Sequence, residues 1–296
     1  MRSSSGTTLV TGASGFVGRH LVAALKQAGY RVTEHSEHGA EHGTEHDGDI
    51  VHCEFPAGPV DHVFHLAAKT FVPASWQSPA SFYEVNVMGT INVLEYCRKH
   101  STPLTFVSSY VYGQPDYLPI TESHPLRAVN PYAHSKLLAE DVCGFYTRNF
   151  QVPVTIIRPF NLYGPGQADQ FLIPTLIRQA LSPDHPAIVV NDTAPRRDYI
   201  YITDLIDLFL ASAAKPNPGI YNAGSGCSYS IADIVNLINE LLPVAKPLES
   251  RGDLRTNEIP DVVADVARAR AAFGWMPQVN FRDGISRTMQ ALQGSQ

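Results

Sequence analysis

Tyr132 and Lys136 lie four residues apart in PYAHSKLLAE, a segment that predicts a helix, so their side chains share one helix face. A free phenol has a pKa of about 10 and is a poor base at neutral pH, but a neighbouring ammonium group lowers that pKa. Ser108 ends an apolar segment one crossover loop earlier. Together the three side chains could remove a proton from a substrate hydroxyl. The alternative is that three polar residues only pack at the end of a sheet.

The elements that must position these residues follow an alternating pattern. Short apolar segments bounded by turn residues predict strands at 7–12, 31–34, 49–54, 62–68, 104–109 and 154–159. Helical patterns lie between them, including 18–28, 82–100 and 131–149, and Asn130 with Pro131 suits the N-cap and first turn of the last. The alternation predicts βαβ units and hence an α/β fold of the Rossmann type, with a doubly wound parallel sheet.

The texture of the chain changes after Pro159, where turn-rich segments begin. We expect a smaller C-terminal lobe that binds the substrate. The dinucleotide-binding domain is assigned to 1–165 with 198–223, and the substrate-binding lobe to 166–197 and 224–296.

Three glycines, Gly12, Gly15 and Gly18, stand between the first predicted strand and the first predicted helix. Glycine permits a tight turn, and it lets backbone N–H groups approach a pyrophosphate whose charge a helix N-terminus favours. The spacing is Gly-x-x-Gly-x-x-Gly rather than Gly-x-Gly-x-x-Gly. Because a strand precedes the glycines and a helix follows them, the segment predicts dinucleotide binding rather than a plain turn.

Several segments together resemble the extended short-chain dehydrogenase/reductase family, the nucleotide-sugar epimerases and dehydratases. They are TGASGFVG, HLAA, NVMGTINVLE, SSYVYG, PYAHSK, RPFNLYGPG and RRDYIYITD. The resemblance runs from about residue 7 to about residue 277 and implies an NAD(P)-dependent enzyme that moves a hydride at a hexose carbon. It implies that Tyr132 is the base, that Lys136 lowers its pKa and bonds the nicotinamide ribose, and that Ser108 bonds the substrate oxygen.

The resemblance also assigns binding residues. For the cofactor, NAD with NADP as the alternative, they are Gly12, Gly15, Phe16, Val17, Gly18, Ser36, Asp49, Ile50, Leu66, Ala67, Ala68, Tyr132, Lys136 and Pro159. For the nucleotide-sugar substrate they are Ser109, Asn161, Arg197 and Arg251. Arginine suits a diphosphate because its planar fork donates two bonds to phosphate oxygens, and the bland alternative for both arginines is a surface ion pair.

Two departures from the family pattern bear on the reaction. Ser109 and Tyr110 stand where the 4,6-dehydratases carry acidic residues, so no carboxylic acid is present there to expel a C6 hydroxyl. Ser36 stands at or near the end of the second strand, where an acidic residue usually holds the adenosine ribose. Glu34, Glu37 and Glu41 still make this edge negative, which favours NAD over NADP.

A histidine run follows the second strand: HGAEHGTEH repeats the pattern His-x-x-Glu-His of some zinc peptidases through His38, His42 and His46. That site needs a helix, and Gly39, Gly43 and Gly48 disfavour one by about 1 kcal/mol each. We therefore expect a polar loop beside the adenosine pocket and no metal site, with adventitious or regulatory metal binding and a zinc peptidase as the alternatives.

Composition and charge limit the kinds of binding partner that we expect. The 296 residues are 44% apolar and 17% charged, with a net charge of −6 and no basic run, so nucleic acid and anionic membranes are not expected. No long apolar segment predicts a signal or a membrane span, and four scattered cysteines suggest reduced thiols, so we expect a cytoplasmic protein. The resemblance implies a homodimer paired through a four-helix contact.

These observations favour a nucleotide-sugar 4-epimerase. The alternatives are an NADPH-dependent 4-keto-6-deoxy nucleotide-sugar reductase and a dehydratase with displaced acids. From a different class comes a non-catalytic dinucleotide sensor, which would have no need of Ser108, Tyr132 and Lys136 together.

Overall fold

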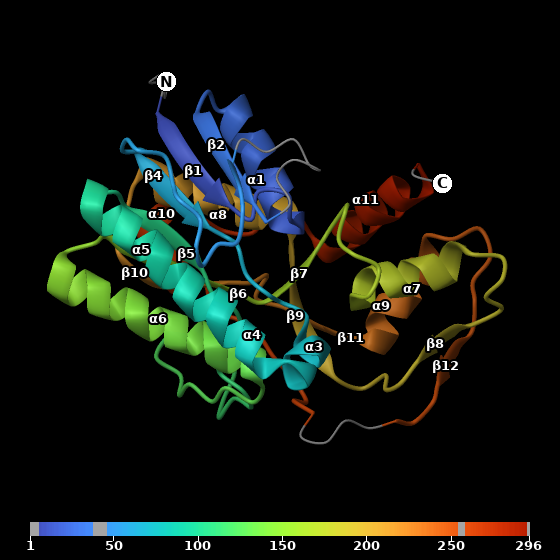
Figure 1. The fold of residues 1–296 in the computed structure, drawn as a ribbon. Coiled ribbons are helices and arrows are strands. Elements are labelled where there is room, and N and C mark those ends of the chain that lie inside the picture. Colours follow the sequence, from blue (N-terminus) through green and yellow to red (C-terminus); the bar gives the residue numbers. More distant parts are fainter. Residues whose placement is uncertain (1–5, 38–45, 254–257, 295–296) are drawn as a thin grey trace.

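A seven-stranded sheet forms the centre of the computed structural model, which describes residues 6–37, 46–253 and 258–294 (Figure 1). Its strands run in the order β10-β6-β5-β4-β1-β2-β3, and every neighbouring pair is parallel. Their bounds are β1 Thr7–Thr11, β2 Arg31–Ser36, β3 His46–Asp47, β4 His62–His65, β5 Leu104–Val107, β6 Val154–Pro159 and β10 Gly219–Ala223. The strand order reverses between β1 and β4, which places a switch point at their carboxyl ends.

Helices cover both faces of this sheet, which confirms the predicted doubly wound Rossmann-type fold. On one face lie α1 (Phe16–Gln27) and α8 (Ile202–Ala214), whose apolar residues share one buried cluster with the sheet. On the other lie α5 (Gly89–His100) and α6 (Pro131–Phe150), packed on a second cluster. The strands β4 and β6 are buried along their whole length, as expected for strands that helices cover on both faces.

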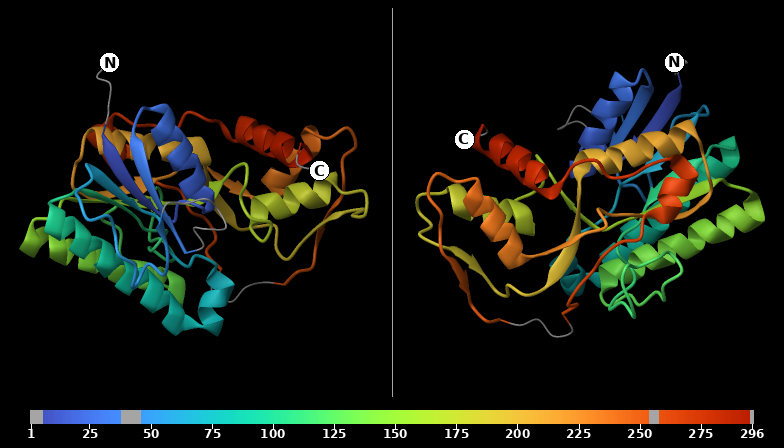
Figure 2. Two further views of the ribbon diagram at one scale, coloured as in Figure 1. Left: turned by 45° about the horizontal axis from the view of Figure 1, so that its top comes forward. Right: turned by 180° about the vertical axis from the view of Figure 1, so that it is seen from behind.

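The C-terminal lobe lies beside the sheet, opposite α5 and α6 (Figure 2). It holds a three-stranded sheet and a two-stranded sheet, ordered β11-β9-β7 and β12-β8. The bounds are β7 Asn161–Tyr163, β8 Ile188–Val190, β9 Arg196–Tyr201, β11 Ser228–Ser230, β12 Leu248–Ser250, α7 Leu172–Leu181, α9 Ile231–Glu240 and α11 Phe281–Gln293. Helix α10 (Ala267–Phe273) returns to pack on β10. The residue boundaries predicted for the two domains stay a prediction.

One strand prediction was wrong. Residues 49–54 form a turn, and the third strand is the short β3 just before them. Asp49 accounts for the difference, since its carboxylate accepts a bond from the Val51 N–H at 3.1 Å and its carbonyl accepts one from the Cys53 N–H at 2.8 Å. Such local bonds compete with strand pairing.

The helix predicted at 82–100 is divided. Short helices α3 (Val72–Gln77) and α4 (Pro79–Tyr83) lead into a π-helical segment, η1 (Glu84–Met88), and then into α5. The predicted cap of α6 is confirmed, because the Asn130 side chain accepts a bond from the Ala133 N–H. All four cysteines are free thiols, and no helix among the described residues could cross a membrane.

Candidate active site

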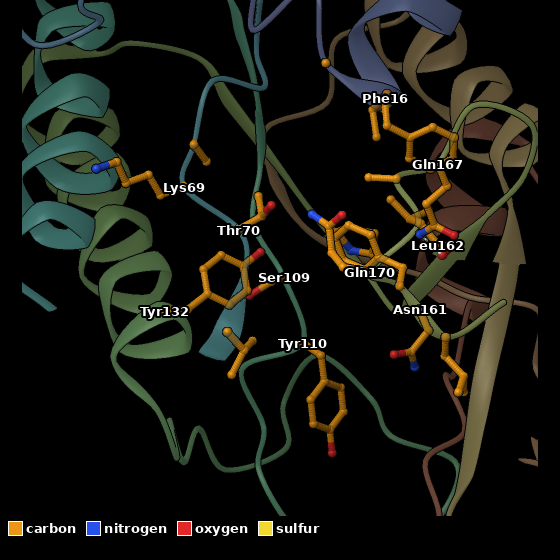
Figure 3. Close-up of a pocket in the computed structure, with 18 of the residues that line it drawn as sticks. Phe16, Lys69, Thr70, Ser109, Tyr110, Tyr132, Asn161, Leu162, Gln167 and Gln170 are labelled. Carbon is orange, nitrogen blue, oxygen red and sulfur yellow. Dashed lines mark hydrogen bonds between the residues drawn. The ribbon is translucent and has the colours of Figure 1, made fainter. Parts of the chain in front are cut away.

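A cleft of about 1170 Å³ opens where the carboxyl ends of β1, β4, β5 and β6 face the C-terminal lobe (Figure 3). Every residue assigned to the cofactor lines it, from Gly12 to Pro159, and so do Ser108, Ser109, Asn161 and Arg197. Of the residues assigned from sequence, Arg251 lies elsewhere, in a neighbouring cavity of about 400 Å³ that includes Asp169 and Arg178. The fold thus brings together residues from both halves of the chain.

The glycine turn at the mouth of α1 has no room for side chains. Gly12 has a φ of +71°, and a Cβ there would lie 2.7 Å from the backbone nitrogen of Ala67. A Cβ on Gly18 would lie 2.1 Å from the Gly12 carbonyl oxygen. The α1 N-terminus carries no side-chain cap, so its N–H groups face the cleft unshielded. This cradle fits a dinucleotide pyrophosphate.

The second strand ends at the same cleft. The Ser36 hydroxyl is buried and accepts a bond from the Ser14 N–H at 3.1 Å, which ties β2 to the glycine turn. Glu37, Asp49 and Ile50 also line the cleft here. Glu34 instead pairs with Lys26 at 2.6 Å on the surface, so it adds less negative charge to this edge than the sequence suggested.

Tyr132 and Lys136 occupy the first turns of α6, and both side chains face the cleft. Burial raises the pKa of Tyr132, and the nearby Ser109 hydroxyl lowers it in part. Burial lowers the pKa of Lys136 to about 8, while Cys143 and Glu140 act in the opposite direction. The Lys136 ammonium lies 4.3 Å from the centre of the Phe106 ring, a cation–π contact. A partly desolvated cation therefore stands one helical turn from the phenol.

The two serines at the end of β5 differ in their partners. Ser108 donates a short hydrogen bond to the carboxylate of Glu140 on α6. Ser109 is also buried, but its hydroxyl forms no well-aligned hydrogen bond within the described residues. In Figure 3 Ser109 lies beside the Tyr132 side chain, whose pKa it affects.

Glu140 is the centre of a buried ion pair that the sequence did not reveal. Its carboxylate accepts three bonds from the Arg158 guanidinium, at 2.5, 2.9 and 3.2 Å, and both side chains are almost fully buried. Arg158 also donates to the Tyr112 hydroxyl at 2.9 Å, and Tyr112 donates to Asn222 at 2.5 Å. Arg158 thus serves the core beneath the cleft.

Asn86 in η1 is a second residue that sequence reasoning missed. Its amide bonds both the N–H and the carbonyl of Lys69, at 2.9 and 3.0 Å, and the Ser135 hydroxyl at 2.9 Å. It therefore joins the loop after β4 to the turn of α6 that carries Lys136. Asn86 lies in the π-helical segment, and the sequence signal that could have pointed to it is the Asn in NVMGT.

The buried His65 side chain joins the ends of β1 and β4. Its ring nitrogens bond Thr11 at 2.7 Å and Thr90 at 3.0 Å, and burial together with Lys136 lowers its pKa to about 3. The ring is therefore neutral at physiological pH, and it adds no charge to the site.

Arg197 reaches the substrate end of the cleft already paired. It forms a short ion pair with Glu258, and it donates to the carbonyls of Arg196 and Ile259 at 2.7 Å each. Asn161 donates to the Asp198 carbonyl at 3.1 Å and lines the cleft. A diphosphate here would share or replace the bonds of Arg197.

Most of the histidine run lies outside the described residues. His38 and His42 are not among the described residues, and the backbone of His46 forms part of β3. Among the residues that the structure describes, no group of three or more His, Cys, Asp or Glu could hold a metal ion.

Comparison with known proteins gives the family. Residues 8–224 match the NAD-dependent epimerase/dehydratase family. The chain is 28% identical to a putative UDP-glucose 4-epimerase of Methanocaldococcus jannaschii, over 97% of this chain and 98% of that protein. It is 31% identical to a GDP-6-deoxy-D-mannose reductase of Pseudomonas aeruginosa, over 93% of each. The solved structure of an NAD-dependent NDP-hexosamine 5,6-dehydratase from tunicamycin biosynthesis superposes with a TM-score of 0.88 at 32% identity, over 98% of both chains.

Proposed function

The chain belongs to the NAD-dependent epimerase/dehydratase family, and we propose that it is a nucleotide-sugar 4-epimerase that uses NAD. The observation that carries this is the cleft, in which the glycine cradle, Tyr132 and Lys136 line one cavity with Asn161 and Arg197. Relatives named as UDP-glucose 4-epimerases support the reaction.

The geometry of the cleft supports the following roles. Tyr132 takes the proton of the sugar C4 hydroxyl as the C4–H bond of the sugar breaks. The Lys136 ammonium one turn away stabilises the phenolate. A bound nicotinamide dinucleotide supplies the acceptor for the hydride. A serine at the end of β5 bonds the reacting oxygen, and Ser108 and Ser109 are the two candidates. Tyr132 then returns the proton when the hydride comes back to the other face of the keto sugar.

Cofactor choice rests on the end of β2. Glu37 lines the cleft beside Ser36, and a carboxylate there suits the two ribose hydroxyls of NAD and repels a 2′-phosphate. Two observations favour a second candidate, the 4-keto-6-deoxy nucleotide-sugar reductase with NADPH. Ser36 replaces the usual acidic residue, and a reductase is 31% identical to this chain.

The experiment is turnover of UDP-hexoses by purified protein without added cofactor, since an epimerase regenerates the cofactor that it holds. We expect interconversion of a 4-epimer pair with no net absorbance change at 340 nm, and NAD in the denatured protein by mass spectrometry. Stoichiometric consumption of NADPH with a 4-keto-6-deoxy nucleotide sugar, and no reaction with UDP-hexoses, would establish the reductase instead. A 4-keto or unsaturated product from a nucleotide hexose would establish a dehydratase.

The proposal includes a homodimer and a cytoplasmic location. Leu138, Phe145 and Phe150 on α6 are 39%, 49% and 45% exposed, and an apolar helix face of this kind suits a homodimer paired through α5 and α6. Phe145→Glu should then shift the mass measured by light scattering from two chains toward one. The four free thiols suit a reducing cytoplasm.

A further inference from the structure

We propose that Ser109, and not Ser108, is the hydroxyl that bonds Tyr132 and the reacting oxygen of the substrate. The inference rests on the proposed function, and it changes which of the two serines at the end of β5 acts in the chemistry.

The alternation of β5 separates the two side chains. Phe106 belongs to the buried cluster under α5 and α6, whereas Val107 packs against the cluster on the opposite face. Since side chains alternate along a strand, Ser108 returns to the α6 side, where it meets Glu140. Ser109 follows as the chain leaves the strand and lines the cleft.

The Ser108 hydroxyl is already committed. Its single proton is donated to Glu140, a carboxylate that is buried and fixed by Arg158. If Ser108 turned toward a substrate, this buried carboxylate would lose a charge-assisted hydrogen bond, which is among the stronger bonds in proteins. Arg158 cannot move to compensate for this loss, because its guanidinium also donates a hydrogen bond to the Tyr112 hydroxyl.

The Ser109 hydroxyl has the opposite character. It is buried, with 7% of the residue exposed, and within the described residues its oxygen makes no well-aligned hydrogen bond. It lies close enough to Tyr132 for hydrogen bonding to lower the pKa of the phenol (Figure 3). A buried hydroxyl without a full partner is unfavourable, so a polar group arriving in the cleft would satisfy it.

These contacts define a role in both halves of the reaction. While Tyr132 is a phenolate, Ser109 donates its proton to the phenolate oxygen. After Tyr132 has taken the proton of the substrate hydroxyl, Ser109 donates to the carbonyl oxygen of the keto sugar. Its own O–H bond stays intact throughout.

The test compares Ser109→Ala with Ser108→Ala, with Ser109→Thr as rescue and the exposed Ser123→Ala as a matched control. We expect Ser109→Ala to lower kcat by about 100-fold or more, as loss of a donor at a reacting oxygen does, with little change in KM. Ser109→Thr keeps the hydroxyl and should recover most of the rate. Ser108→Ala should lower the unfolding temperature, and its kcat should fall by less than about tenfold.

A second readout needs no substrate. The absorbance of ionised tyrosine, taken as the difference between each protein and its Tyr132→Phe partner, follows the phenol of Tyr132 alone. Removing the Ser109 hydroxyl should move this titration to higher pH, and removing the Ser108 hydroxyl should not.

The outcomes separate the two proposals. If the wild type turns over no nucleotide sugar, the proposed function fails, and the titration still decides which serine bonds Tyr132. If Ser108→Ala lowers kcat as much as Ser109→Ala does, or moves the titration while Ser109→Ala does not, the inference is overturned.

Discussion

Tyr132 has opposing influences on its pKa: burial raises it, and the Ser109 hydroxyl lowers it. The phenol can act as a base only if the nearby charge of Lys136 stabilises its ionised form. Tyr132→Phe keeps the ring and removes the hydroxyl, so kcat should fall by about 10²- to 10⁴-fold. Cofactor affinity, measured by fluorescence titration, should stay nearly unchanged. A residual rate above about a tenth of the wild-type rate corresponds to an increase of under about 1.4 kcal/mol in the barrier, and it would exclude Tyr132 as the base.

Lys136 gives the pH dependence. Its pKa of about 8 lies below the ordinary value of 10.5, so the charge beside Tyr132 is present below about pH 8 and lost above it. We expect kcat/KM to fall as pH rises through this region. Lys136→Arg, whose guanidinium stays charged, should keep its residual activity to higher pH.

Stability should move in the opposite direction. Between about pH 8 and 10.5 the unfolded chain holds the Lys136 proton and the folded chain does not. This group therefore adds stability as pH rises across that window. Urea unfolding of the wild type and Lys136→Met at several pH values measures the contribution, and an equal slope for the two proteins would rule it out.

At the scale of elements, the turn between β1 and α1 depends on Gly18. A Cβ there would lie 2.1 Å from the Gly12 carbonyl oxygen and 2.7 Å from that of Ala13, so the backbone must move. Gly18→Ala should weaken cofactor binding at least tenfold and destabilise the fold by about 1–3 kcal/mol. Gly58→Ala is the matched control, because a Cβ at Gly58 meets nothing within 4 Å. Equal cofactor affinity in the two variants would show that the turn does not cradle the dinucleotide.

The same elements show what the sequence could predict. Periodicity and turn residues gave the central strands, the glycine turn and the cap at Asn130, because these depend on neighbours in the chain. The turn at Asp49 was missed because a local side-chain bond replaced strand pairing. The partner of Ser108 was missed for a different reason. Glu140 lies 32 residues away on another element, and only the folded chain brings the two together.

At the scale of the whole molecule, the cleft joins the dinucleotide cradle of the sheet to polar groups of the C-terminal lobe. Arg197 is held there by Glu258, so a diphosphate competes with a carboxylate for the same guanidinium. In the proposed reaction the sugar is anchored by its nucleotide, and its C4 atom faces Tyr132 from either side. In the same proposed reaction the hydride leaves and returns within this one cleft.

The most direct test of this account follows that hydride. UDP-glucose carrying deuterium at C4 is incubated with the purified protein in ordinary water, with unlabelled NADH present. Because Tyr132 handles only the proton, and the hydride stays on a cofactor that is not released, the 4-epimer should keep its deuterium at C4. Loss of deuterium to water, or release of deuterated cofactor into the free NADH pool with the epimer still formed, would contradict it.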